Sequence, residues 1–497
     1  MTDRHDLPPG FRWGVATAAY QIEGAAREDG RGPSIWDTFT AREGTVRDGH
    51  TGDTACDHYH RWHEDVALMR GLGVDAYRFS IAWPRVQPTG QGAVNGAGLA
   101  FYDRLVDALL DAGIEPLPTL FHWDLPQALE DGGGWLERDT AYRFAEYAAV
   151  VADRLGDRVR SWITLNEPFV HMVYGYALGN HAPGRALLLD ALPVAHHQLL
   201  GHGLAAAELR ARGGAVLITN NLTPVRPASG SAEDLAAAEA YDTLHNRLFN
   251  DPVLLGSYPD LSAFGVSADL GGAVRDGDLE LIAAPLDGLG VNYYNPTLIT
   301  APADPGLPFA DAPIEGVPRT AFGWPVVPDG LRELLVGLRG RYGAALPPVT
   351  ITENGCSYPE DLDDQDRISY LSTHLDALAA AAAEGVDVRG YFTWSLLDNF
   401  EWAEGYHQRF GLVHVDFDSQ KAHPPRLLRL VPRPDRPSPH PARAPGALMR
   451  GSVRRGTWAA GLARVDRTAG AWEDRFTDGI RTGAVGRAVR TVIEEQL

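Results

Sequence analysis

Residues 349–355 read Val-Thr-Ile-Thr-Glu-Asn-Gly, a run of β-branched residues that ends in a carboxylate, an amide and a glycine. β-Branched residues favour buried strands, and the polar residues and glycine mark a strand end. A second stretch, residues 162–168, is built in the same way and reads Trp-Ile-Thr-Leu-Asn-Glu-Pro. The sequence therefore predicts two strands, far apart along the chain, that deliver Glu353 and Glu167 at their carboxyl ends.

Strand-like runs alternate with helical patterns between residues 11 and 394. Apolar residues at helical spacing that end at a glycine indicate the helices, for example over residues 62–73 and 101–113. The predicted strands are residues 11–17, 74–83, 114–121, 162–167, 215–219, 286–293, 349–352 and 388–394. Strands that alternate with helices predict an α/β fold, a parallel (β/α)8 TIM barrel.

Polar and aromatic residues follow several of these strands directly. In a (β/α)8 barrel the carboxyl ends of all strands share one mouth, where active sites lie. Five residues are therefore expected to meet there: His122, Glu167, Asn292, Glu353 and Trp394.

Composition narrows the classes of partner. The formal net charge of −21 argues against nucleic acid and anionic membranes, whereas a neutral sugar places no demand on charge. The two cysteines, Cys56 and Cys356, match no metal-binding spacing and are interpreted as reduced thiols. Residues 1–10 contain no apolar run typical of a signal sequence, and no stretch approaches the ~18 apolar residues of a membrane span. We therefore expect a cytoplasmic protein with no membrane partner.

Paired carboxyls at a barrel mouth suit the hydrolysis of an acetal. Hydrolysis with retention uses two carboxyls ~5–5.5 Å apart, one as nucleophile and one first as acid and then as base. Burial and a nearby negative charge keep the acid protonated, whereas hydrogen-bond donors and a cation keep the nucleophile ionised. Tyr294 and Arg78 are candidates for that support because each lies near a strand end. Arg78 also fits a structural ion pair, which is compatible with this role.

Aromatic and amide side chains near the same strand ends suit a sugar. Tryptophans there offer a platform for the apolar face of a pyranose ring. The candidates are Trp36, Trp123, Trp324, Trp394 and Trp402. The candidates for hydrogen bonds to hydroxyls are Gln21, His122, Asn166, Asn292 and Glu401. A single histidine is more often a core residue, but His122 stands between two aromatic residues at the end of a predicted strand.

Seven motifs, in order, resemble those of the β-glucosidases of glycoside hydrolase family 1 over about residues 11–421. They lie at residues 11–24, 77–85, 119–126 (Thr-Leu-Phe-His-Trp-Asp-Leu-Pro), 164–168 (Thr-Leu-Asn-Glu-Pro), 290–294 (Gly-Val-Asn-Tyr-Tyr), 351–355 (Ile-Thr-Glu-Asn-Gly) and 393–402. The resemblance implies a retaining, exo-acting β-glycosidase that removes terminal non-reducing β-D-glucosyl residues by double displacement. Its substrates would be small β-glucosides and short oligosaccharides, and it would need no metal or organic cofactor.

The resemblance also implies roles for individual residues. Glu167 matches the acid/base and Glu353 the nucleophile, and Trp324 is similar to the platform for the leaving group. The family's groups around the nucleophile correspond in this chain to Arg78, Asn292 and Tyr294. The contacts to the non-reducing sugar match Gln21, His122, Trp123, Asn166, Trp394, Glu401 and Trp402.

Subgroups of the family differ in the loop that follows the last strand. Relatives that act on 6-phosphorylated sugars replace the Glu401-Trp402 pair, which is intact here, and Gln408 and Phe410 supply no cation although Arg409 is near. A sugar without phosphate is therefore favoured. The choice among glucose, galactose and fucose, the balance between hydrolysis and transglycosylation, and the choice between a monomer and a homo-oligomer stay open.

Residues 422–497 differ from the rest of the chain. They contain 14 arginines and 7 acidic residues, and eight prolines fall between Pro424 and Pro445. Such a run excludes helix and central strand, so we predict a barrel over residues 1–421 and a mostly irregular Arg/Pro-rich tail. The family continues instead into a final outer helix, which indicates either a shifted reading frame or a natural extension. Loss of that helix gives an alternative function, a sugar-binding protein with impaired catalysis.

Overall fold

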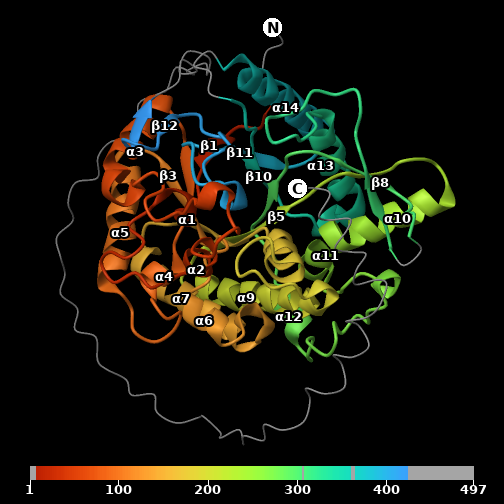
Figure 1. Ribbon diagram of the computed structural model, residues 1–497, viewed down its shortest axis with the longest axis horizontal. Coiled ribbons are helices and arrows are strands. Elements are labelled where there is room, and N and C mark those ends of the chain that lie inside the picture. The colour runs from red at the N-terminus through yellow and green to blue at the C-terminus, as the bar shows by residue number, and fades with distance from the viewer. Residues whose placement is uncertain (1–6, 305–306, 360–363, 424–497) are drawn as a thin grey trace, which may run out of the picture.

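A closed barrel of eight parallel strands forms the centre of the computed structural model, which describes residues 7–304, 307–359 and 364–423 (Figure 1). The strand order around the barrel is β1-β11-β10-β7-β5-β4-β3-β2. The bounds are β1 (Arg12–Ala16), β2 (Ala76–Ser80), β3 (Glu115–Phe121), β4 (Ser161–Asn166), β5 (Ala215–Asn221), β7 (Gly288–Asn292), β10 (Val349–Asn354) and β11 (Val388–Trp394). The predicted (β/α)8 TIM barrel is confirmed, and each predicted strand is present within a few residues of its expected bounds.

The parallel register brings the carboxyl ends of distant strands together. Asn292 pairs with Asn221 of β5 and with Glu353 of β10. The register is irregular just before each glutamate, between Ile351 and Glu353 where β10 pairs with β7 and between Ile163 and Asn166 where β4 pairs with β5. Such irregularities bend a strand and redirect its side chains, and they are common next to active sites. Here they end the two strands whose glutamates the sequence singles out.

Helices surround the barrel and bury its outer face (Figure 1). They include α3 (His58–Leu72), α5 (Gly96–Asp111), α7 (Asp139–Leu155), α9 (Leu192–Ala211), α11 (Leu248–Leu255), α13 (Asp329–Tyr342) and α14 (Gln365–Ala383). In α5, Phe101, Leu105 and Leu109 recur at helical spacing and are buried against the barrel. This packing holds the strand ends in fixed positions.

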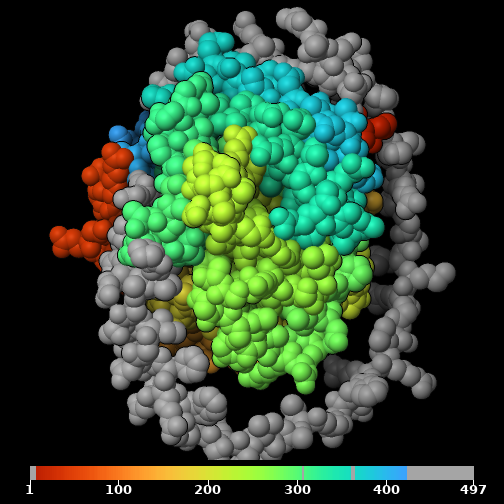
Figure 2. All heavy atoms as spheres, turned by 90° about the vertical axis from the view of Figure 1, so that its right-hand side faces the viewer, coloured from red at the N-terminus to blue at the C-terminus, as the bar shows by residue number. Residues whose placement is uncertain are grey.

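One flank of the barrel carries a small additional sheet. It joins β6 (Val225–Pro227), β8 (Thr297–Thr300) and β9 (Ala310–Ala312), and α10 (Ala232–Asp242) packs on it. Figure 2 shows that the chain from α10 to α14 covers this side of the molecule.

The first residues of the predicted tail continue into structure. Ala422 and His423 belong to β13 (Lys421–His423), which pairs antiparallel with β12 (His414–Asp416). The predictions for residues 424–497 lie outside the described residues. Within the described part of the chain, no helix is both long enough and apolar enough to cross a membrane. Both cysteines are buried as free thiols.

Candidate active site

Glu353 lies at the carboxyl end of β10 with a donor on each carboxylate oxygen. Arg78 of β2 reaches across the barrel and places Nη1 2.5 Å from Glu353 Oε1, while the Tyr294 hydroxyl donates to Oε2 at 2.7 Å. Burial raises the pKa of Glu353, and the charge of Arg78 and the hydrogen bond from Tyr294 oppose that rise. The donors therefore favour the ionised carboxylate, and the predicted support by Arg78 and Tyr294 is present in the geometry.

Glu167 follows β4 and has a left-handed backbone conformation, with φ of 45°. This conformation is costly for a residue with a Cβ and is typical of functional sites. It places the carboxyl group where Asn292 Nδ2 donates to Oε1 at 2.7 Å and Asn221 Nδ2 donates to the same oxygen at 3.1 Å. Because both donors use Oε1, a proton on this group resides on Oε2.

The pKa of Glu167 is raised to about 8, first by burial and then by the negative charge of Glu353. At neutral pH this group keeps its proton while Glu353 has the donors that stabilise an anion. The two carboxyls therefore have different surroundings, a cation and a hydroxyl around Glu353 and two amides around Glu167, as a nucleophile and an acid require.

Asn166 links the two carboxyls to the opposite wall of the mouth. Its Oδ1 accepts hydrogen bonds from Arg78 Nη2 at 2.6 Å and Asn292 Nδ2 at 3.1 Å, and its Nδ2 donates to His122 Nε2 at 2.9 Å. Nε2 of His122 is therefore an acceptor, and the ring proton lies on Nδ1. Burial lowers the pKa of His122 well below its usual value, so the ring is neutral. His122 Nδ1 is buried and has no hydrogen-bond partner among the described residues, which leaves a donor for a ligand hydroxyl.

Gln21 occupies a second wall of the mouth. Its Nε2 lies 3.0 Å from Asn399 Oδ1, 3.0 Å from the carbonyl oxygen of Phe400 and 3.2 Å from Glu401 Oε2. Its Oε1 is buried without a partner within the described ranges and can accept a hydrogen bond from a ligand. The pKa of Glu401 is raised to about 8, chiefly by burial and then by the charges of Glu353 and Glu167.

Aromatic rings line the space between these walls. Trp394 ends β11. The centre of the His122 ring lies 5.9 Å from that of Trp394 and 6.0 Å from that of Trp402. The ring of Trp123 packs on that of Trp402, with 4.7 Å between ring centres. Both residues have a positive φ angle, 72° for Trp123 and 49° for Trp402. Trp36 is wholly buried in α2 (Ile35–Thr40), 4.6 Å behind Trp402, so its predicted place at a strand end is wrong.

Trp324 is partly exposed and packs against the group of buried residues that contains Trp394. Its ring stacks on Phe322, with 4.4 Å between ring centres, and its centre lies 5.1 Å from that of Tyr294, the residue that donates to Glu353. Its predicted role as a platform for the leaving group stays a prediction.

Two amides of the site were not predicted from the sequence. Asn221 holds Glu167 and is itself held by His245, whose Nε2 lies 3.1 Å from Asn221 Oδ1. The strand predicted over residues 215–219 stops short of Asn221, although an amide just beyond it was a sign available in the sequence. Asn399, which fixes Gln21, lies in a loop whose course no local pattern indicates.

Comparison with known proteins agrees with this geometry. The sequence profile of glycosyl hydrolase family 1 matches residues 3–429. Thermostable β-glucosidase B of Thermobispora bispora is 51% identical over 429 residues, which cover 84% of this chain and 88% of that protein. The bifunctional β-D-glucosidase/β-D-fucosidase of Bifidobacterium breve is 47% identical over 446 residues, with 84% and 95% covered.

A solved structure gives the same result in three dimensions. The crystal structure of psychrophilic β-glucosidase BglU from Micrococcus antarcticus superimposes with a TM-score of 0.82 at 47% identity, covering 86% of this chain and 96% of that chain. Sequence profile, overall identity and fold all agree over the barrel. This chain belongs to glycosyl hydrolase family 1.

Proposed function

We propose that this protein is a retaining, exo-acting β-glucosidase that releases terminal non-reducing β-D-glucosyl residues from small β-glucosides and short oligosaccharides. One observation carries the proposal: two buried carboxyls at the barrel mouth have opposite environments. Glu353 has Arg78 and Tyr294 as donors, whereas Glu167 is held protonated by burial and by the charge of Glu353. Retaining glycosidases need this pair.

In the first step Glu353 attacks the anomeric carbon while Glu167 gives its proton to the departing glycosidic oxygen. The bond between the anomeric carbon and that oxygen breaks, and an ester between Glu353 and the sugar forms. This ester removes the negative charge that helps to raise the pKa of Glu167. Glu167 has given up its proton by then, and its lowered pKa keeps it ionised, so it acts as the base that takes a proton from water. The water attacks the anomeric carbon, which breaks the ester, releases the sugar and restores Glu353.

The two walls of the mouth fit the hydroxyls of a single terminal sugar. His122 Nδ1 offers a donor and Gln21 Oε1 an acceptor, and both are buried without partners in the described part of the chain. Glu401 adds a carboxyl beside Gln21. Buried polar groups of this kind recognise a sugar that pairs with them and reject one that leaves them unpaired. The tryptophan rings of Trp394 and Trp402 provide apolar surface for the ring face.

The alternative function, a sugar-binding protein with impaired catalysis, is not favoured. Both carboxyls are in place with their hydrogen-bond partners, and Asn166 connects the donors of one to those of the other. A binding protein has no need for a carboxyl held protonated next to one held ionised.

Hydrolysis of 4-nitrophenyl β-D-glucoside, followed by proton NMR of the first sugar released, tests the proposal. We expect β-glucose to form first and to convert slowly to the α anomer. A Glu167→Gln, Glu353→Gln variant provides the matched background. α-Glucose as the first product contradicts the retaining mechanism, and a folded chain that binds glucose without turnover supports the binding protein instead.

A further inference from the structure

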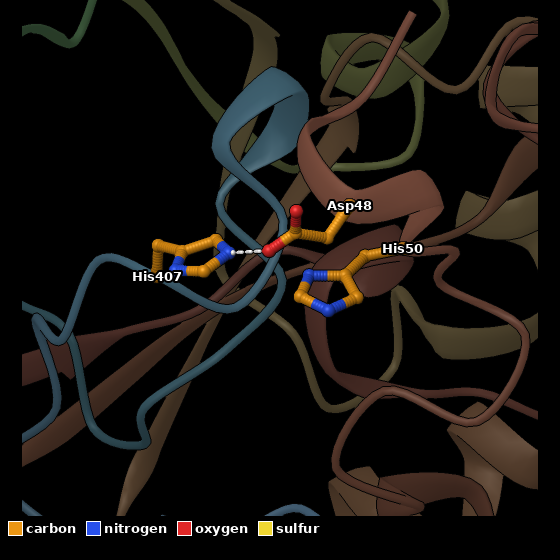
Figure 3. Close-up of side chains that lie close together, drawn as sticks. All are labelled: Asp48, His50 and His407. Carbon is orange, nitrogen blue, oxygen red and sulfur yellow. Dashed lines mark hydrogen bonds and ion pairs between the residues drawn. The ribbon is translucent and has the colours of Figure 1, made fainter. Parts of the chain in front are cut away.

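A second group of metal-ligating side chains lies on the surface, apart from the catalytic carboxyls. Asp48, His50 and His407 each direct one ligand atom into the same space, and these three atoms all lie within 4.8 Å of one another. Figure 3 shows Asp48 and His50 on one segment and His407 on another, with the Asp48 carboxylate between the two rings. Asp48 belongs to η1 (Arg47–Gly49), whereas His407 follows η8 (Trp402–Glu404).

We propose that Asp48, His50 and His407 bind a divalent transition-metal ion, with Zn²⁺ as the representative cation. Two imidazoles and one carboxylate suit zinc, nickel and copper better than magnesium or calcium, which prefer oxygen ligands. Ligand atoms at ~2.0–2.1 Å around a tetrahedral ion lie about 3.3 Å from one another. The three atoms lie within 4.8 Å of one another, and rotation of the exposed Asp48 and His407 side chains can bring them to that spacing. Water completes the fourth position.

The hydrogen bonds of the group favour a cation. His407 Nε2 lies 2.7 Å from Asp48 Oδ2, so a metal ion replaces the proton that these two atoms share. The backbone N–H of Tyr406 donates to His50 Nδ1 through a long hydrogen bond of 3.2 Å, so this nitrogen carries no proton, and a metal ion bound at Nδ1 would take the place of that hydrogen bond.

The neighbouring contacts hold both segments in place. Arg47, which precedes Asp48, forms an ion pair with Glu404 at 3.1 Å, so its positive charge is already neutralised by a carboxylate. Gly405 has φ of 60°, and a Cβ on it would lie 2.4 Å from His50 Nδ1, so this close approach needs glycine. Tyr406 donates its hydroxyl to the carbonyl oxygen of Thr51 at 2.8 Å.

A bound ion would join the segment of residues 47–50 to the segment that carries Glu401 and Trp402. Trp402 is the first residue of η8, and Glu401, just before it, contacts Gln21 of the sugar-binding wall. Because the ion binds the folded arrangement, it stabilises that arrangement by mass action. We expect zinc to raise the thermal unfolding temperature and to restrict this wall of the active site.

Isothermal titration of the full, untagged chain with Zn²⁺ alone tests the site. We expect one zinc ion per chain, at least tenfold weaker binding in His50→Ala and in His407→Ala, and loss of the zinc-dependent rise in unfolding temperature in both. Asp48→Asn is the conservative variant, because asparagine tolerates the φ of 55° found at this position. It removes the charge while it keeps the backbone, and we expect weaker binding there too.

His60→Ala is the matched control. His60 is an exposed histidine with Asp57 and Glu28 as carboxylate neighbours, 2.6 and 3.1 Å from its two ring nitrogens. It is not part of the three-residue group, so we expect unchanged zinc binding in this variant. Co²⁺ serves as a spectroscopic probe, since its visible absorption changes when imidazole nitrogens bind it. Wild-type protein that takes up no zinc, or His50→Ala and His407→Ala variants that bind it with wild-type affinity, would overturn the proposal.

Discussion

At the scale of single residues, three carboxyl groups share one buried mouth and influence one another. Burial raises the pKa of Glu167, Glu353 and Glu401, and the charge of Glu353 raises the pKa of the other two further. Among the residues that the structure describes, a cationic side chain lies within hydrogen-bond distance of Glu353 but of neither Glu167 nor Glu401. The division of roles between the carboxyls therefore depends on where Arg78 points.

The pKa of Glu167 predicts the alkaline limb of the pH profile. Glu167 must be protonated to act as the acid, and its pKa is raised to about 8, so kcat/KM should fall about tenfold per pH unit above that value. Removal of the negative charge in Glu353→Gln should lower the pKa of Glu167. Kinetics from pH 5 to 10 measure the first effect, and carbon-13 NMR of the labelled Glu167 carboxyl measures the second. A profile that stays flat to pH 10, or a pKa unaffected by Glu353→Gln, disagrees with this assignment.

Sequence patterns predicted which residues meet but not how they bond. Glu167 and Glu353 were found from their places after strand-like runs, which a local pattern can indicate. The donation of Asn221 to Glu167 Oε1 and the free Nδ1 of His122 depend on distances across the barrel. Protonation states depend on burial, which local sequence does not determine.

At the scale of elements, the join between β10 and β11 decides where Glu353 points. Gly355 follows β10, and a Cβ at this position would lie 1.8 Å from the carbonyl oxygen of Trp394, at the end of β11. Gly355 therefore has two roles. It marks the end of the strand, and its lack of a side chain allows the backbones of β10 and β11 to approach closely.

Gly355→Ala should reduce both stability and activity. The added methyl group must separate the ends of β10 and β11, which costs about 1–3 kcal/mol of unfolding free energy and displaces Glu353 and Trp394. Gly337→Ala in α13 is the matched control, since a Cβ there meets no atom within 4 Å and alanine favours a helix. Urea unfolding and kcat/KM measure the two effects. Equal stability of the two variants would show that the strand ends tolerate the methyl group.

The segment after β11 predicts discrimination against phosphorylated sugars. Gln408 is bonded to Ser357 and Glu404, and the guanidinium of Arg409 is held by Asp398 at 3.1 Å and by a carbonyl oxygen of Val415. The guanidinium of Arg409 is therefore already paired with a carboxylate.

We expect kcat/KM for 4-nitrophenyl 6-phospho-β-glucoside to be at least about 100-fold below that for the unphosphorylated glucoside, since a phosphate buried without a cationic partner carries a large desolvation cost. The two substrates share one leaving group, so the ratio reports the sugar alone. Comparable values would place an unrecognised cation at this subsite.

At the scale of the whole molecule, alternation of strands and helices was sufficient to predict the barrel. Its strands are short and largely buried, and each lies close to its predicted position. The sheet of β6, β8 and β9 was not predicted, because its strands are three or four residues long and pair across many intervening residues. The grouping of Asp48, His50 and His407 likewise depends on two segments that the barrel brings together.

The assignment of Glu353 as nucleophile and Glu167 as acid/base connects all three scales, because each carboxyl lies on its own strand end and faces its own donors. Glu167→Ala removes the general acid and should lower kcat about 10²–10⁴-fold for substrates with poor leaving groups. Glu353→Ala removes the nucleophile and should lower kcat far more. Small anions such as azide can occupy the space of the missing carboxyl. Their products then report which face of the sugar each carboxyl served.

The most direct test is the anomeric configuration of the azide product from each variant with 2,4-dinitrophenyl β-glucoside. In Glu353→Ala, azide should replace the nucleophile and give α-glucosyl azide. In Glu167→Ala, azide should attack the ester on Glu353 and give β-glucosyl azide. β-Glucosyl azide from Glu353→Ala, or the α product from Glu167→Ala, would contradict the assignment of the two roles.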